Sequence, residues 1–176
     1  MTSAKGATVF TVGHSTRPIE ELVDLLRAAG VRLLVDVRRY PVSRRYPHFS
    51  GPALRASLAA AGIHYRHEVD LGGHRQPRSD SPNKAWRAAA FRGYADHMAT
   101  AEFAAALARL EAAAAAQPAA VLCAEADPTR CHRQLVADAL TARGARVVHL
   151  LGPGRMEDHV LHPAARITPR GGLVYG

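Results

Sequence analysis

The chain of 176 residues is long enough for one domain with its own hydrophobic core, so its folding requires neither disulfides nor a metal ion. Hydrophobic residues make up 48% and charged residues 22% of the chain, which excludes disordered and collagen-like proteins. No apolar run approaches the roughly 20 residues of a membrane-spanning helix, and residues 1–6 lack the features of a secretory signal. We therefore expect a cytoplasmic protein with no membrane partner.

The charge balance favours an anionic partner. The chain has 23 Lys and Arg residues against 15 Asp and Glu residues, a formal net charge of +8. Only Lys5 and Lys84 are lysines, and arginine is favoured where phosphate or carboxylate is bound by two parallel hydrogen bonds. The charge therefore favours a nucleotide or a nucleic acid as partner. The alternative is a composition rich in Ala and Arg throughout, which explains part of the excess.

Predicted strands and helices alternate along the chain. In chain order we expect a strand over 7–12, a helix over 18–29, a strand over 33–37, a loop over 38–49, a helix over 50–61, a strand over 63–67, a loop over 68–83, helices over 85–98 and 101–116, a strand over 119–123, a helix over 127–143 and a strand over 146–151. The tail after Gly152 is predicted to be irregular. This order predicts an α/β fold, a single-domain three-layer sandwich with a mostly parallel sheet of about five strands and helices on both faces.

Ligands of such sheets bind outside the carboxyl ends of the strands. The segments that leave the predicted strand ends are Gly13–Ser15, Asp36–Arg38, Cys123–Glu125 and the residues from His149 onward. These are also the short segments richest in reactive side chains, so we expect a functional site where they meet.

The densest of these segments runs from Cys123 to Arg133. Its second half opens the predicted helix, whose free N–H groups attract anions, and Arg133 is a candidate anion-binding residue. A thiol at a helix N-terminus flanked by arginines has a lowered pKa. Cys123 or Cys131 is therefore a candidate nucleophile with His132 as its base, and Glu125 is a candidate general acid or base.

Two other interpretations of the cysteines stay open. Cys131 is also explained as a small buried hydrophobe that packs its helix against the sheet. Cys123, Cys131 and His132, with His14, are also potential metal ligands, but their spacing matches no standard zinc pattern, so we assign no metal site. The sequence indicates no particular cofactor.

The loop over 38–49 interleaves four arginines with two tyrosines and a phenylalanine. Guanidinium groups bind phosphate and aromatic rings stack on bases, so Arg38, Ser43 and Arg44 are candidate substrate contacts. The alternative is a solvated basic loop whose path is set by prolines. Asp36 is a further candidate residue of the substrate-binding site, most simply one that orients Arg38 or the backbone of the first loop, with a catalytic base as the alternative.

The segment after the first strand also carries candidate residues. Gly13 allows the backbone to approach a ligand closely, and His14 suits an acid, a base or a ligand. Ser15 is a candidate helix cap or substrate contact. Tyr94 belongs to the packing face of its helix but is placed to reach the site.

Common nucleotide-binding, zinc-protease and serine-hydrolase signatures are absent. Instead, five ordered motifs resemble the family called DUF488: Gly13–Ser15, Asp36-Val-Arg-x-x-Pro41-x-Ser43-Arg44 through Phe49, Leu71-Gly-Gly73, Phe91-Arg-Gly-Tyr94-Ala-Asp, and Cys123-Ala-Glu125 with Cys131-His132-Arg133. The resemblance runs from about residue 9 to 151 within a single domain over 1–176. It implies a compact cytoplasmic α/β domain with its motif residues gathered at one end of the sheet. The family name denotes no known reaction.

Three hypotheses follow for the function. The first is an enzyme that acts on a phosphate-bearing, nucleotide-like substrate or on nucleic acid at the strand ends. The second is a nucleic-acid-binding module without catalysis, and the third is a thiol- or metal-dependent redox protein that uses Cys123 and Cys131.

Overall fold

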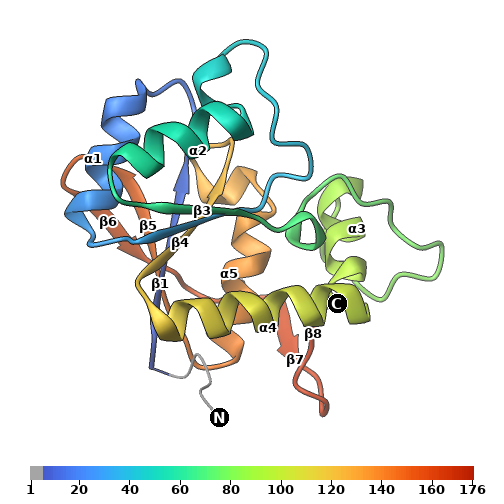
Figure 1. The fold of residues 1–176 in the computed structure, drawn as a ribbon. Helices are drawn as coiled ribbons and strands as arrows, with labels where there is room; N and C mark the ends of the chain where they lie inside the picture. The colour runs from blue at the N-terminus through green and yellow to red at the C-terminus, as the bar shows by residue number, and fades with distance from the viewer. Residues whose placement is uncertain (1–5) are drawn as a thin grey trace.

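A computed structural model describes residues 6–176 (Figure 1). It contains a six-stranded sheet in the order β3-β2-β4-β1-β5-β6, in which all strands are parallel except β6. The strands are β1 (Thr8–Gly13), β2 (Leu33–Asp36), β3 (His64–His67), β4 (Ala119–Cys123), β5 (Arg146–Gly152) and β6 (Arg155–Asp158). The predicted α/β class and mostly parallel sheet are confirmed. Most of residues 1–6, where no secretory signal is expected, lies outside the described residues.

Helices cover both faces of the sheet. The helices are α1 (Ile19–Ala28), α2 (Gly51–Ala60), α3 (Ala89–His97), α4 (Ala101–Ala116) and α5 (Arg133–Ala142). Buried leucines of α1 and α2 pack with Val12, Leu34 and Leu122 in one core, whereas α3, α4 and α5 pack with Val9 and Val121 in the other. Figure 1 shows α2 and α4 on opposite sides of β3. Two cores on opposite faces make the three-layer sandwich.

Three predicted segments differ from the structure. The tail is not irregular, because β6 pairs with β5 and the strands β7 (Ala165–Ile167) and β8 (Leu173–Tyr175) form a hairpin. All four residues of β6 are exposed, so no apolar alternation marks it in the sequence. The segment predicted as a helix over 127–143 is a 3-10 helix, η3 (Pro128–Arg130), followed by α5, because Cys131 between them has an extended backbone.

The remaining difference is at the start of α3. The predicted helix over 85–98 begins instead at Ala89. The preceding residues do not form a helix because other contacts fix their backbone: the Ala85 N–H donates to the Tyr175 carbonyl, and the Asn83 side chain donates to Asp96.

The strand order places a switch point between β1 and β4. The chain leaves β1 toward α1 on one face of the sheet, whereas it leaves the neighbouring β4 toward η3 and α5 on the other face. In open α/β sheets, ligands bind in the crevice that such divergence opens at the carboxyl ends of the strands. The crevice here lies beside Gly13 and Cys123, which are register partners.

Candidate functional site

A cleft of about 410 Å³ lies at this switch point. Seven of the residues predicted from the sequence line it: His14, Arg38, Ser43, Cys123, Glu125, Cys131 and His132. They come from the ends of β1, β2 and β4, from the loop over 38–49 and from the start of α5. The structure thus brings together side chains that are up to 118 residues apart, since His14 and His132 share this cleft.

The loops after β1 and β4 interlock behind the cleft. The His14 N–H donates to the Cys123 carbonyl at 3.0 Å and the Ser15 N–H donates to the Ala124 carbonyl at 2.8 Å. A Cβ at Gly13 would lie 1.7 Å from the Glu125 carbonyl oxygen, so only glycine allows this approach. The carboxyl ends of the two strands are therefore held in one fixed arrangement.

Cys123 lies at the floor of the cleft with 1% of its surface exposed. Its sulfur accepts hydrogen bonds from Arg133 Nη1 at 2.9 Å and from the thiol of Cys131, whose sulfur is 2.6 Å away. Arg133 is fully buried and also donates to the carbonyls of Glu125 and Ala126. Arg133 thus lies behind the sulfur and does not line the cleft, although the sequence suggested it as an anion-binding residue.

These contacts shift the pKa values of the two cysteines in opposite directions. Burial raises the pKa of Cys123, but the hydrogen bond from Cys131 and the charge of Arg133 outweigh it and lower the pKa to about 7. The pKa of Cys131 is raised well above its usual value, first because its thiol donates to Cys123 and second because it is buried. Cys123 is therefore the thiolate of the pair and Cys131 the thiol.

His132 lies next to this pair as a neutral acceptor. Its Nε2–H donates to the Val37 carbonyl at 2.7 Å, which leaves the lone pair of Nδ1 facing the Cys131 sulfur at 3.6 Å. Burial is the main reason that the pKa of His132 is lowered to about 4. Gly73 packs against the ring, since a Cβ there would lie 3.0 Å from Nδ1. At neutral pH His132 is therefore a neutral hydrogen-bond acceptor beside Cys131.

His14 forms part of the opposite wall. Its Nδ1–H donates to the Ser15 carbonyl at 3.0 Å, and its ring stacks on Phe49 with 4.5 Å between centroids. Burial lowers the pKa of His14, so the neutral ring keeps a lone pair on Nε2. Ser15 has a φ of 48°, and its side chain caps no helix, since the residue that precedes α1 is Pro18. The geometry of this loop thus holds His14 as an acceptor.

Asp36 and Arg38 form a buried pair at the end of β2. Arg38 donates to both carboxylate oxygens, at 2.9 Å from Nε and 2.7 Å from Nη2, and the Tyr65 hydroxyl donates to the same carboxylate at 2.6 Å. Asp36 is completely buried, so it orients the guanidinium and does not contact the cleft. Nη1 of Arg38 is buried and has no hydrogen-bond partner within the described residues. One donor of this guanidinium therefore lacks a partner among the described residues, and Arg38 itself lines the cleft.

Other candidates occupy different places. Ser43 organises its own loop, because its hydroxyl accepts from the Tyr46 N–H at 3.1 Å. Arg44 is exposed and does not line the cleft. Tyr94 is fully buried behind it, where its hydroxyl donates to the Leu71 carbonyl and holds the Gly72–Gly73 segment in place.

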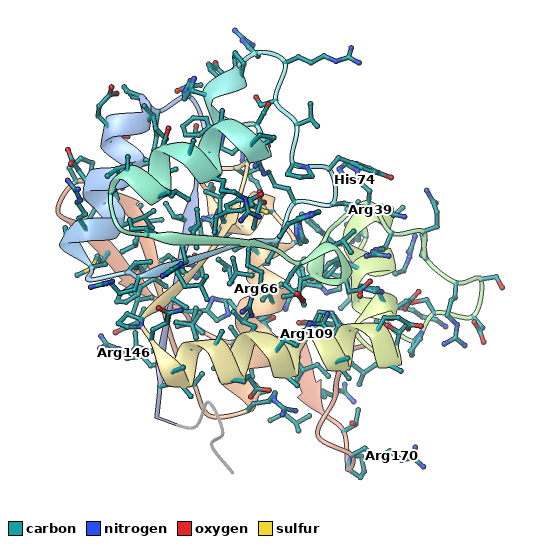
Figure 2. All side chains as sticks on the ribbon, in the orientation of Figure 1. Arg39, Arg66, His74, Arg109, Arg146 and Arg170 are labelled. Carbon is teal, nitrogen blue, oxygen red and sulfur yellow. The ribbon has the colours of Figure 1, made fainter. Side chains whose placement is uncertain are left out.

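Sequence reasoning missed Arg39, His74 and Arg130, which also line the cleft. Arg39 Nη1 donates to the His74 carbonyl at 2.6 Å, and Figure 2 shows the two residues side by side. The Arg38-Arg39 pair was visible in the sequence, but the contact with His74 crosses 35 residues. Figure 2 also shows Arg66, Arg109, Arg146 and Arg170 spread away from this wall, so much of the positive charge lies outside the cleft.

A buried polar chain leads from the cleft to the far side of β1. Arg133 Nε donates to the Thr11 hydroxyl at 3.0 Å, which donates in turn to His149 Nδ1 at 2.5 Å. His149 Nε2 donates to His159, which donates to Asp138 at 2.7 Å. His149 was expected at the strand-end site, but it lies within β5 and lines a second cleft of about 580 Å³.

Two further properties concern the whole described chain. Within residues 6–176, no group of three or more His, Cys, Asp or Glu side chains is arranged to hold a metal ion. In the same range, no helix has the length and apolar content needed to cross a membrane.

Comparison with known proteins gives one match. The family model described as "Domain of unknown function DUF488" matches residues 18–140, which include α1 and most of α5. The match covers the motifs from Asp36 to Arg133 but not Gly13–Ser15. No curated protein and no solved structure matches the chain.

Proposed function

Because the chain belongs to the DUF488 family, whose name specifies no reaction, we propose its function from the geometry of the cleft: a cysteine-dependent enzyme that hydrolyses phosphate esters of small, nucleotide-like molecules. The observation that carries this proposal is the Cys123 sulfur at the floor of the cleft, which lies 2.9 Å from the buried Arg133 guanidinium behind it. A thiolate held by a buried cation is an activated nucleophile.

The walls of the cleft support an anionic substrate. Arg38, Arg39 and Arg130 line it, whereas Glu125 is the one carboxylate among the described lining residues. Nη1 of Arg38 has no partner among the described residues, so a phosphate oxygen would satisfy it. The exposed ring of Tyr40 on the rim offers a stacking surface for a base.

The reaction we propose has two steps. The Cys123 thiolate attacks phosphorus, the phosphorus–oxygen bond breaks, and the leaving oxygen takes a proton from the Glu125 carboxyl. Water then attacks the cysteinyl phosphate and gives its proton back to Glu125, which releases inorganic phosphate and restores the thiolate. Nε2 of neutral His14 accepts a hydrogen bond from this water and orients it.

The test is hydrolysis of p-nitrophenyl phosphate and of mononucleotides by the purified protein. We expect phosphate release by the wild type, loss of turnover in Cys123→Ser, and loss of turnover with retained binding in Glu125→Gln. The matched control is Arg44→Ala, since Arg44 is exposed and lies outside the cleft. Full activity in Cys123→Ser, or no release from any phosphate ester, would overturn the proposal.

A second candidate function is binding of single-stranded nucleic acid without catalysis. The favouring observation is the loop over 38–49, which exposes Tyr40, Val42, Arg44 and Arg45 together. Such binding predicts affinity that falls steeply with salt, because several phosphates release counterions. Thermal shifts with oligonucleotides that are lost in Arg44→Ala, without any phosphate release, would favour this function over the first.

A further inference from the structure

The two cysteines are in direct contact although no disulfide joins them. Cys123 ends β4 and Cys131 lies in the turn between η3 and α5, eight positions further along the chain, and their sulfurs are 2.6 Å apart. Both line the cleft, and their exposed fractions are only 1% and 6%. A small reagent that enters the cleft therefore meets both sulfurs, whereas a large one does not.

The surroundings give the two sulfurs different tasks. Arg133 holds a negative charge on Cys123, and its other hydrogen bonds to Thr11 and to backbone carbonyls keep the guanidinium in place. Cys131 carries the proton and has the Nδ1 lone pair of His132 at 3.6 Å. Cys123 is thus arranged to attack first, and Cys131 to attack second, with His132 beside it as a neutral hydrogen-bond acceptor.

We propose that Cys123 and Cys131 form an oxidation site for small hydroperoxides, which closes to an intramolecular disulfide. The Cys123 sulfur attacks the distal oxygen of the peroxide, the O–O bond breaks, and the departing alkoxide or hydroxide takes a proton from water. Cys123 is oxidised to a sulfenic acid and the peroxide is reduced to an alcohol or to water. Cys131 then attacks the Cys123 sulfur while its proton passes to the departing hydroxyl, which leaves as water, with His132 Nδ1 as the adjacent hydrogen-bond acceptor.

The same contacts make the disulfide easy to reduce. Oxidation removes the negative charge on Cys123 and leaves the buried Arg133 guanidinium without its anionic partner. A reduced state that is stabilised in this way raises the reduction potential of the pair. We therefore expect a dithiol to restore both thiols. This chemistry does not require phosphate-ester hydrolysis, and it explains why such an activity would stop under oxidation.

The experiment treats the purified, reduced protein with one equivalent of hydrogen peroxide and follows intact mass and free thiols. In the wild type we expect loss of both thiols, a mass lower by two hydrogen atoms, no dimer on a non-reducing gel, and full reversal by dithiothreitol. In Cys131→Ser the sulfenic acid has no second thiol, so dimedone should label Cys123. Cys123→Ser should keep its remaining thiol under the same treatment.

Three outcomes would overturn the inference. They are retention of both thiols by the wild type, disulfide-linked dimers in place of the internal disulfide, and dimedone labelling of Cys131 in Cys123→Ser at the rate seen for Cys123 in Cys131→Ser. Each variant is first compared with the wild type by circular dichroism, and the wild-type mass result stands even where a variant fails to fold. Phosphate release is measured separately, so its absence leaves the thiol result interpretable.

Discussion

Replacing Arg133 by methionine tests the central electrostatic argument of the site. The pKa of Cys123 is lowered from its ordinary value of 9.0 to about 7, which corresponds to a preference for the thiolate of about 3 kcal/mol. Arg133→Met keeps most of the side-chain volume but removes the guanidinium 2.9 Å from the sulfur. Because Cys123 remains buried, its pKa should then rise toward 9.0.

The assay is the pH dependence of iodoacetamide alkylation, with peptide mass spectrometry separating Cys123 from Cys131. A full return to 9.0 lowers the thiolate fraction at neutral pH from about one half to about one in a hundred. A more basic thiolate is also roughly eightfold more nucleophilic, so the rate should fall only about sixfold and the midpoint pH is the better measure. Arg133→Lys, which keeps the charge, should keep a midpoint between the two. An unchanged midpoint in a folded Arg133→Met protein would refute the reasoning.

Three further predictions concern stability. A methyl group at Gly13 has no space beside the Glu125 carbonyl, so Gly13→Ala should lower the free energy of unfolding by about 3 kcal/mol. The control is Gly152→Ala, whose methyl group meets nothing within 4 Å and should change the free energy of unfolding by less than about 0.5 kcal/mol. Urea denaturation measures both, and equal effects would contradict the interlocked loops. Asp36→Asn leaves a buried guanidinium unpaired and should lower the free energy of unfolding by about 3–5 kcal/mol. Tyr65→Phe removes one hydrogen bond to the same carboxylate and should lower it by about 1–2 kcal/mol. A larger loss for Tyr65→Phe than for Asp36→Asn would be inconsistent with the buried Asp36–Arg38 ion pair. The pKa of His132 is about 4 in the folded protein and 6.5 in the unfolded chain. As the pH falls from 6.5 toward 4, the unfolded chain therefore binds a proton that the folded protein does not, and the free energy of unfolding decreases. Unfolding at about pH 5 should need roughly 2 kcal/mol less than at about pH 7.5, and a His132→Gln variant with the same pH slope would argue against this source.

Much of the fold and the position of the cleft follow from local sequence patterns. Leu22, Leu25 and Leu26 are spaced for one buried helix face, and Gly30, with a φ of 73°, ends that helix as predicted. The rule that ligands bind at the carboxyl ends of parallel strands needs only the strand positions and the side chains that follow them. This rule places His14 and Cys123 at the same edge of the sheet, and the adjacency of β1 and β4, which the sequence does not reveal, brings them into one cleft.

Contacts between distant segments could not be predicted in this way. Arg44 and Arg39 belong to one loop and have the same side chain, but only Arg39 lines the cleft, because the carbonyl of His74 holds its guanidinium. Arg133 follows Cys131 and His132 in the sequence, yet its side chain extends behind the sheet end toward Thr11. The direction of a side chain in an irregular loop depends on tertiary neighbours, which one sequence does not reveal.

The polar chain behind the cleft also connects chemistry with folding. Arg133 and Thr11 are 122 residues apart in the sequence, and Thr11 and His149 are 138 residues apart. The hydrogen bonds that hold Arg133 beside the Cys123 thiolate therefore join segments from most of the chain. Contacts of such long sequence separation form late, after the loops between them have closed. A chain that is still being synthesised therefore carries two ordinary, weakly reactive thiols. The appearance of a fast-reacting cysteine would be a built-in signal, readable with a thiol reagent during refolding, that β1, β4, β5 and α5 have all assembled.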